Sequence, residues 1–175
     1  GDTAGGLRNV FDGAGGNDTL FGGAGGDTLI GGAGNDSADG GAGNDSLSGG
    51  TGIDTLSYAS AGSGVTVDLE AGTATGGGGT DTIVAAGARD GTGDRFEALS
   101  GSLFDDSLAG SAGNDTIAGN DGNDTIEGGA GNDTLLGGNG ADWASFAHDT
   151  AGVSVALDNS GDGTSSGSLA GNDTL

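Results

Sequence analysis

Aspartate residues that recur every nine positions are the groups in this sequence best suited to chemistry. The chain of 175 residues has 26 acidic and three basic residues, and 23 of the acidic residues are Asp. A short carboxylate in a turn can reach nearby backbone groups or a metal ion. Cysteine is absent and His148 is the one histidine, which excludes thiolate sites and imidazole clusters. The chemistry that remains is ligation of a hard cation by oxygen atoms.

These aspartates belong to two runs of five nonapeptides with the pattern Gly-Gly-x-Gly-x-Asp-x-U-x, in which U is apolar. The first run begins at Gly13 and the second at Gly101, 88 residues later. The segments that follow the runs also match, since Val65 and Val67 correspond to Val153 and Val155. The sequence therefore contains two copies of one large unit, and we interpret it as a segment of a longer array.

The repeats predict a division of the chain into five parts on one continuous solenoid. These are residues 1–12 as the tail of a preceding unit, 13–57 as the first block, 58–100 as a spacer of further coils with longer loops, 101–145 as the second block, and 146–175 as a second, truncated spacer. The spacers contain alternating apolar and polar residues, as in Val65-Thr66-Val67-Asp68-Leu69, which indicates half-buried strands.

Each nonapeptide predicts a tight turn followed by a short strand. The glycines permit positive φ angles, and bare backbone allows carbonyl oxygens to converge on one point. In the strand x-U-x, the apolar residue points inward and its neighbours point outward. Two nonapeptides would complete one coil, and stacked coils lie roughly 4.8 Å apart. The pattern therefore predicts an all-β solenoid.

Stacking the turns would bring carboxylates close together with no basic residue nearby. At that separation, two carboxylates repel by about 1 kcal/mol even in water. A cation held by six or more oxygens turns this repulsion into attraction, and a carbonyl-rich cage suits Ca²⁺ better than Mg²⁺. One buried Leu contributes roughly 2 to 3 kcal/mol, whereas ordering nine residues costs on the order of 10 kcal/mol. We therefore expect the metal-free chain to be largely disordered and folding to be coupled to Ca²⁺ binding.

The two blocks resemble the RTX β-roll of secreted bacterial proteins, whose nonapeptide motif they match. This resemblance implies a right-handed parallel β-roll, a β-helix solenoid of stacked two-nonapeptide coils, with Ca²⁺ in the turns along both edges. It also implies secretion as an unfolded chain that folds in extracellular calcium.

The resemblance further implies which residues hold the ions. The side-chain ligands would be Asp18, Asp27, Asp36, Asp45, Asp54, Asp106, Asp115, Asp124, Asp133, Asp142 and Asp173. The backbone carbonyls that complete the shells would be those of Gly22, Gly23, Ala24, Gly31, Gly32, Ala33, Gly40, Gly41, Ala42, Gly110, Gly119, Gly128, Gly129 and Gly137. We expect about eight to ten ions if most adjacent turns hold one. Leu103 and Phe104 stand where small residues belong, which argues against Asp106 as a ligand.

Three functions of different class follow from this fold. The first is a calcium-dependent structural segment, without enzymatic activity, of a secreted bacterial protein such as an adhesin stalk, matrix fibre or surface-layer subunit. The second is the carboxyl-terminal roll of a secreted enzyme or toxin, which aids secretion and folding of a catalytic domain outside this chain. The third is binding of ice or another ligand by the roll. It ranks last, because the third turn position holds Ala in five units and a Thr only at Thr51.

Charge and hydropathy limit the partners. The expected partners are Ca²⁺ and, besides it, neighbouring copies of the chain or surface polysaccharide. A net charge of -23 argues against nucleic acid. No apolar run approaches the length that spans a bilayer, so we expect no membrane insertion. The expected location is extracellular, at the bacterial cell surface.

Overall fold

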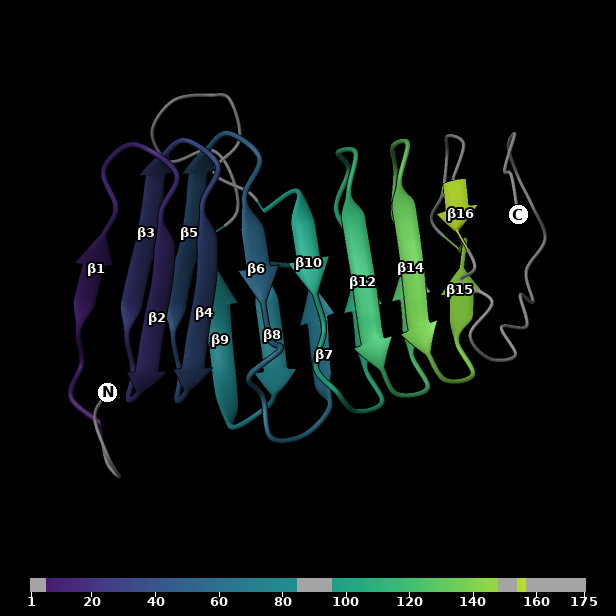
Figure 1. Cartoon of the computed structure of the whole chain (residues 1–175), viewed down its shortest axis with the longest axis horizontal. Coiled ribbons are helices and arrows are strands. Elements are labelled where there is room, and N and C mark those ends of the chain that lie inside the picture. Colours follow the sequence, from purple (N-terminus) through teal and green to yellow (C-terminus); the bar gives the residue numbers. More distant parts are fainter. Residues whose placement is uncertain (1–5, 85–95, 148–153, 157–175) are drawn as a thin grey trace.

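A computed structural model describes residues 6–84, 96–147 and 154–156 of the chain. All regular elements in these residues are β-strands, and they form two sheets that both extend along the long axis of the molecule (Figure 1). The described part therefore holds no helix that is long and apolar enough to cross a membrane.

The two sheets, named A and B, take alternate strands of the repeat blocks. In spatial order, sheet A contains β1 (Val10–Asp12), β3 (Thr28–Ala33), β5 (Ser46–Thr51), β9 (Gly79–Ile83), β8 (Thr73–Gly76), β7 (Val65–Asp68), β11 (Ser107–Ala109), β13 (Thr125–Glu127) and β15 (Trp143–Ser145). Sheet B contains β16 (Ser154–Ala156), β14 (Thr134–Asn139), β12 (Thr116–Asp121), β10 (Ala98–Ser100), β6 (Thr55–Ser57), β4 (Ser37–Ala42) and β2 (Thr19–Ala24).

Successive coils stack in parallel with a step of two nonapeptides. Leu29 of β3 lies beside Leu47 of β5 in sheet A, and Thr19 of β2 lies beside Ser37 of β4 in sheet B. One nonapeptide thus supplies a strand to sheet A, and the next supplies a strand to sheet B. This register confirms the predicted coil of two nonapeptides and the all-β roll.

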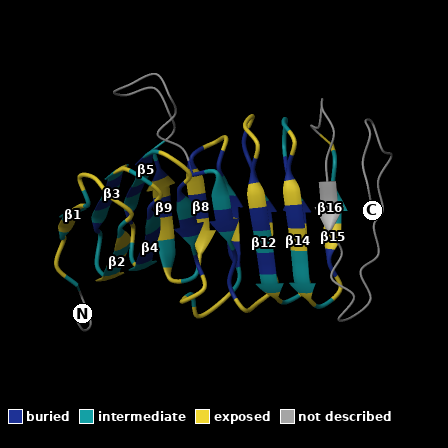
Figure 2. Cartoon of the chain, turned by 45° about the horizontal axis from the view of Figure 1, so that its top comes forward, coloured by how far each residue is buried: buried dark blue, intermediate teal, exposed yellow. Residues whose placement is uncertain are grey.

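The apolar residue of each nonapeptide packs between the sheets. The largest of these side chains, each no more than 2% exposed, are Leu29, Leu47, Leu56, Leu108, Ile117, Ile126 and Leu135. Each contributes roughly 2 to 3 kcal/mol by burial. Figure 2 shows buried segments along the strands and exposed residues in many of the turns between them. The core is therefore one apolar column, and it leaves the polar turns to form the two edges.

The spacer between the blocks adds three strands to sheet A but only β10 to sheet B. Strand β9 pairs in parallel with β5, and β7 pairs in parallel with β11. Strand β8 joins β7 and β9 and is antiparallel to both. In sheet B, β6 pairs directly with β10. The antiparallel strand was not expected, because alternation along Val65–Asp68 indicates a strand but not its direction or its partner.

The spacer shares the core of the repeat blocks. Tyr58, Val65, Val67, Leu69 and Phe96 are buried in the same apolar cluster as the leucines of the nonapeptides. Phe96 is the largest fully buried side chain, with 1% of its surface exposed. The spacer therefore fixes the turns of the second block relative to those of the first.

Candidate metal-binding turns

The aspartates of the nonapeptides form one column along each edge of the roll. Those before strands of sheet A are Asp27, Asp45, Asp106, Asp124 and Asp142, and those before strands of sheet B are Asp18, Asp36, Asp54, Asp115 and Asp133. All except Asp18 are buried. Asp173 lies outside the described residues. Positions in a nonapeptide are counted here from its first residue, so that the aspartate is at position six.

One oxygen of most of these carboxylates is fixed by the backbone of the preceding coil. The amide N–H of Asp18 donates to Oδ1 of Asp36 at 2.8 Å, and the N–H of Asp36 donates to Oδ1 of Asp54 at 2.8 Å. The N–H of Asp124 likewise donates to Oδ1 of Asp142 at 3.0 Å. Each such bond spans 18 residues, the length of one coil. The backbone therefore orients the side chains and accounts for one of their two oxygens.

The second oxygen of many of these carboxylates is buried and has no hydrogen-bond partner. This holds for Oδ2 of Asp18, Asp27, Asp36, Asp45, Asp54 and Asp124. A buried polar atom without a partner costs roughly 1 to 3 kcal/mol, and a charged one costs more. Six such atoms in the described part of the chain indicate positions where a bound species supplies the missing interaction.

Each unpartnered oxygen lies against the first glycine of its own nonapeptide. A Cβ atom at Gly13 would lie 2.6 Å from Oδ2 of Asp18 and 2.5 Å from the carbonyl oxygen of Gly31, one coil further on. The open cradles with this arrangement lie at Gly13 with Asp18 and Gly31, Gly22 with Asp27 and Gly40, Gly31 with Asp36 and Gly49, and Gly119 with Asp124 and Gly137. We call these four turns, residues 13–18, 22–27, 31–36 and 119–124, the open turns. In them, carboxylate and carbonyl oxygens converge where a side chain cannot fit.

The open turns depend on a left-handed backbone at two positions. In the turn at residues 31–36, Gly32 has φ +107° and Gly34 has φ +130°. A side chain at such angles is strained, so glycine is favoured there. The same angles let the backbone of adjacent coils approach closely, which directs carbonyl groups toward the cradle.

Burial raises the pKa of several of these carboxyl groups. The pKa of Asp124 is about 7, chiefly because the group is buried and also because the carboxylates of Asp106 and Asp142 are close; the hydrogen bond from Asp106 opposes this rise. The pKa of Asp45 is raised to about 6, again chiefly by burial, with further contributions from Asp81 and Asp27. A cation in the turns would favour the ionised form of both groups.

Side chains alone do not make a metal site in the described part of the chain. No group of three or more His, Cys, Asp or Glu side chains there is arranged to hold a metal ion. Ca²⁺ takes six to eight oxygen ligands and accepts backbone carbonyls readily. The geometry therefore fits sites in which one or two carboxylates act together with carbonyl groups of stacked turns.

The carbonyls differ in their availability. Five of the predicted carbonyls face the first glycine of the turn one coil earlier, namely those of Gly31, Gly40, Gly119, Gly128 and Gly137. In the two turns that the Gly119 and Gly128 carbonyls face, a serine N–H already donates to the carboxylate. The carbonyl of Ala33 accepts a hydrogen bond from the N–H of Gly16, and that of Ala42 accepts one from the N–H of Gly25. The position-one carbonyls are thus the stronger candidates, and the remaining carbonyl assignments stay predictions.

Two acidic residues that lie outside the nonapeptide blocks continue the columns. The N–H of Asp45 donates to Oδ1 of Asp81 at 3.0 Å, and the N–H of Asp54 donates to Oε2 of Glu97 at 2.8 Å. The repeat motif did not assign either residue to a site, because neither follows a Gly-Gly-x-Gly turn. The only signal was the triplet Asp81-Thr82-Ile83, which matches the end of a nonapeptide.

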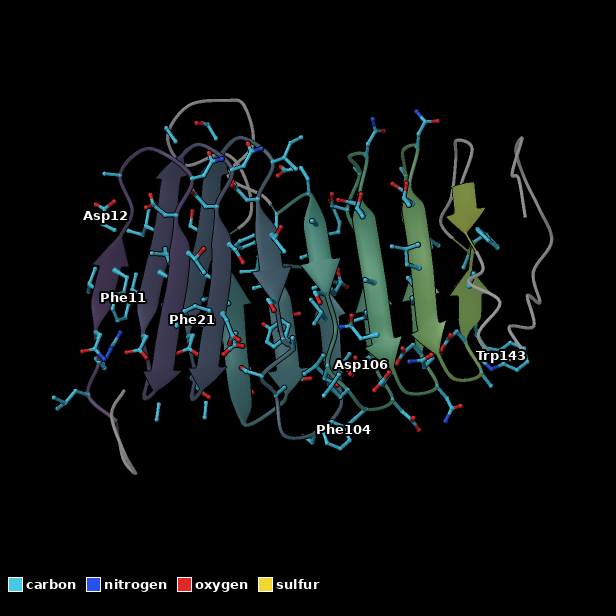
Figure 3. The ribbon with its side chains drawn as sticks, in the orientation of Figure 1. Phe11, Asp12, Phe21, Phe104, Asp106 and Trp143 are labelled. Atoms are coloured by element: carbon cyan, nitrogen blue, oxygen red, sulfur yellow. The ribbon has the colours of Figure 1, made fainter. Side chains whose placement is uncertain are left out.

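Two turns of the second block satisfy their own aspartates. The N–H of Ser102 donates to Oδ2 of Asp106 at 2.7 Å, and the Ser102 hydroxyl lies 2.7 Å from Oδ1. The N–H of Ser111 likewise donates to Oδ2 of Asp115 at 2.6 Å. We call residues 101–106 and 110–115 the closed turns. In the first of them Phe104 points away from the roll, with 46% of its surface exposed (Figure 3).

A third carboxylate is satisfied by the spacer. The hydroxyl of Tyr58 donates to Oδ2 of Asp81 at 2.9 Å. Both residues are buried, with 5% of each exposed. Tyr58 follows the last nonapeptide of the first block, where the next repeat would begin with glycine. The phenol therefore occupies a place that is a cradle in the open turns.

The comparison with protein families agrees with this geometry. A family model for the RTX calcium-binding nonapeptide repeat matches residues 3–38, 21–56, 92–125, 100–135 and 110–144, which together cover more than half of the chain. No curated protein matches the sequence. Among solved structures, the chain is similar to the extracellular lipase LipA from Serratia marcescens, with 21% identity and a TM-score of 0.31. That similarity covers 95% of this chain and 34% of the lipase chain, so this chain spans about a third of it.

Proposed function

Because the chain belongs to the family of RTX calcium-binding nonapeptide repeats, we propose that its open turns bind Ca²⁺ and hold the roll together. In this role the chain is a calcium-dependent structural segment of a secreted bacterial protein at the cell surface or in the extracellular matrix. We assign it no catalytic step. The observation that carries the proposal is the set of buried Oδ2 atoms without partners.

The proposed sites use oxygen atoms from two stacked turns. Asp18, Asp27, Asp36 and Asp124 supply Oδ2, and the facing position-one carbonyl of the next coil supplies a second ligand. Further carbonyls of both turns and water would complete a shell of six to eight oxygens. Asp45 and Asp54 also have an Oδ2 without a hydrogen-bond partner, and we propose them as ligands whose sites are completed by the spacer. Asp133 is proposed as a ligand from the repeat motif. Asp142 and Asp173 stay proposals from the repeat motif.

The structural role follows from the way the sites join coils. Each ion would link a carboxylate of one coil to a carbonyl of the next, so binding stabilises the stack and not one local turn. A chain with net charge -23 repels itself in the compact state. Bound Ca²⁺ reduces this repulsion, and extracellular calcium would thus control when the segment folds.

Circular dichroism in the far ultraviolet, combined with calorimetric titration, tests the proposal. The chain is prepared in chelator, and Ca²⁺ or Mg²⁺ is then added in excess in separate experiments. We expect a cooperative gain of β-structure with Ca²⁺ and little change with Mg²⁺. A chain that is fully β-structured in chelator and unaffected by Ca²⁺ would show that the aspartate turns are not calcium sites.

A pair of variants locates the effect in the turns. Asp36→Asn keeps an oxygen to accept the backbone hydrogen bond but replaces the other oxygen with an amide. We expect it to bind one Ca²⁺ fewer, or to bind one ion at least tenfold more weakly. Asp12→Asn removes the same charge from an exposed residue whose Oδ1 accepts the N–H of Ala14. Equal calcium binding by the two variants would contradict the assignment of Asp36.

A further inference from the structure

The backbone φ angle at position two of the nonapeptide differs between the open turns and the closed turns. In the described blocks this position has a positive φ at Ala14, Gly23, Gly32, Gly41, Gly50, Asn120, Gly129 and Gly138. The positions that depart from this rule are Ser102 and Ser111, neither of which has a positive φ. Position four changes with it, since Phe104 and Gly113 also lack the positive φ found at Gly34 and Gly122. A serine at position two thus accompanies a different conformation of the whole turn.

In this conformation the serine N–H and hydroxyl point toward the carboxylate, and a third donor, a backbone N–H, points toward the serine oxygen. In the turn at residues 101–106, the Ser102 N–H donates to Oδ2 of Asp106 and the Ser102 hydroxyl to Oδ1. The Ser102 oxygen in turn accepts the N–H of Phe104 at 3.1 Å. Oδ1 of Asp106 also accepts the N–H of Val65 at 2.8 Å. Both carboxylate oxygens therefore have partners within the protein.

The turn at residues 110–115 has a similar network with different intervening residues, although the serine hydroxyl lies closer to Oδ2 than to Oδ1 there. The Ser111 N–H lies 2.6 Å and its hydroxyl 3.2 Å from Oδ2 of Asp115, and the Gly113 N–H donates to the Ser111 hydroxyl oxygen at 3.2 Å. Positions three and four are Leu103 and Phe104 in one turn but Ala112 and Gly113 in the other. Serine at position two is therefore the feature that the two closed turns share.

We propose that the residue at position two determines whether a turn is a calcium site, and that Ser102 and Ser111 make their turns metal-independent. This inference rests on the proposed function, because it presupposes that the open turns bind Ca²⁺. The amide and hydroxyl hydrogens of the serine lie where the cation would lie, so they stabilise the carboxylate and repel a positive ion. Asp106 and Asp115 are then structural residues and not ligands.

The closed turns lie on the side of the second block that faces the spacer. Strand β10, which precedes Ser102, and strand β11, which follows it, pair with β6 and β7 respectively. On the other side of the spacer, Tyr58 satisfies Asp81. The protein's own donors thus replace the cation around the junction, and the calcium sites form two groups separated by a metal-independent middle.

Counting bound calcium in variants of the whole chain tests this inference. Equilibrium dialysis with radioactive calcium gives the number of ions per molecule, and circular dichroism in calcium checks that each variant is folded. We expect the double variant Ser102→Gly and Ser111→Gly to bind two more ions than the unaltered chain. An unchanged number in the folded variant would overturn the inference, whereas absence of any calcium in the unaltered chain would instead refute the proposed function.

The converse change has a matched control at one position. Asn120 occupies position two of the open turn at residues 119–124, with φ +81°, and its side chain donates to the Ser100 hydroxyl and the Gly101 carbonyl. Both Asn120→Ser and Asn120→Gly lose these two bonds. We expect Asn120→Ser to close the turn and remove one ion, and Asn120→Gly to retain it. Equal numbers of ions in the two variants would overturn the inference even if the double variant fails to fold.

Discussion

Residues 13–54 and residues 101–115 follow the same nine-residue pattern but satisfy their aspartates in different ways. In the first region Oδ2 of each position-six aspartate is buried without a partner. In the second region a serine amide donates to that oxygen. The fold tolerates both solutions, because in each region the aspartate leads directly into a strand with an inward apolar residue. The difference shows that the motif specifies the coil, whereas a single turn residue specifies how the charge is balanced.

Removal of calcium should have the largest effect and should divide the molecule along this comparison. In chelator, we expect amide hydrogens in β2 to β5 to exchange within the shortest sampling times, because the open turns there lose their charge balance. Amides in β7, β10 and β11 should exchange more slowly, since closed turns and the buried Phe96 surround them. Hydrogen exchange read by mass spectrometry measures this difference. Uniform exchange along the chain would contradict it.

A methyl group placed in an open cradle should have the next largest effect. The Cβ of Gly31→Ala would lie 2.5 Å from Oδ2 of Asp36 and still closer to the carbonyl of Gly49. We expect the free energy of unfolding in calcium to fall by about 2 to 4 kcal/mol, as for other large steric changes. Gly62→Ala is the control, because no atom lies within 4 Å of its Cβ. Urea unfolding at fixed calcium measures both, and similar losses would show that the cradle is not tightly packed.

Asp115→Asn should have the smallest effect and should sharpen the contrast with Asp36→Asn. The amide places a donor or a weaker acceptor opposite the Ser111 N–H, which should lower the free energy of unfolding by about 1 to 2 kcal/mol. The number of bound calcium ions should stay the same, because the closed turn holds none. Urea unfolding and equilibrium dialysis give the two quantities. Loss of an ion in this variant would place Asp115 among the ligands.

The repeat pattern predicted the architecture because every coil obeys one rule. A period of nine, with Leu or Ile at the eighth position, was enough to place Leu29 above Leu47 and to stack the aspartates 18 residues apart. Such regularity leaves few alternative registers, since a slip by one residue would expose the whole apolar column. The parallel stack and the columns of aspartates along both edges could therefore be derived from the sequence.

The parts that the sequence did not predict depend on contacts outside the repeat. Asp81 reaches the column through a hairpin, 36 residues from Asp45, and Glu97 does so 43 residues from Asp54. No local pattern encodes such separations. The closed turns were also missed at Asp115, because their cause is the φ angle of one serine within an otherwise good motif. For Asp106, the bulky Leu103 and Phe104 indicated a departure from the calcium-binding motif, although the hydrogen bonds to its carboxylate come from Ser102.

The unequal strand counts at the spacer have a mechanical consequence. Three strands separate β5 from β11 in sheet A, whereas β6 and β10 are direct neighbours in sheet B. In a regular stack, one strand of sheet A would lie between β5 and β11 to match β6 and β10, so sheet A has two extra strands. At about 4.8 Å per strand, one side of the solenoid gains roughly 10 Å of length that the other side lacks. Unequal lengths of this kind favour a bend of the axis toward sheet B. A fibre made of many 88-residue units would bend once in each, always toward sheet B, and would follow a curved or superhelical path that tension could straighten before any coil unfolds.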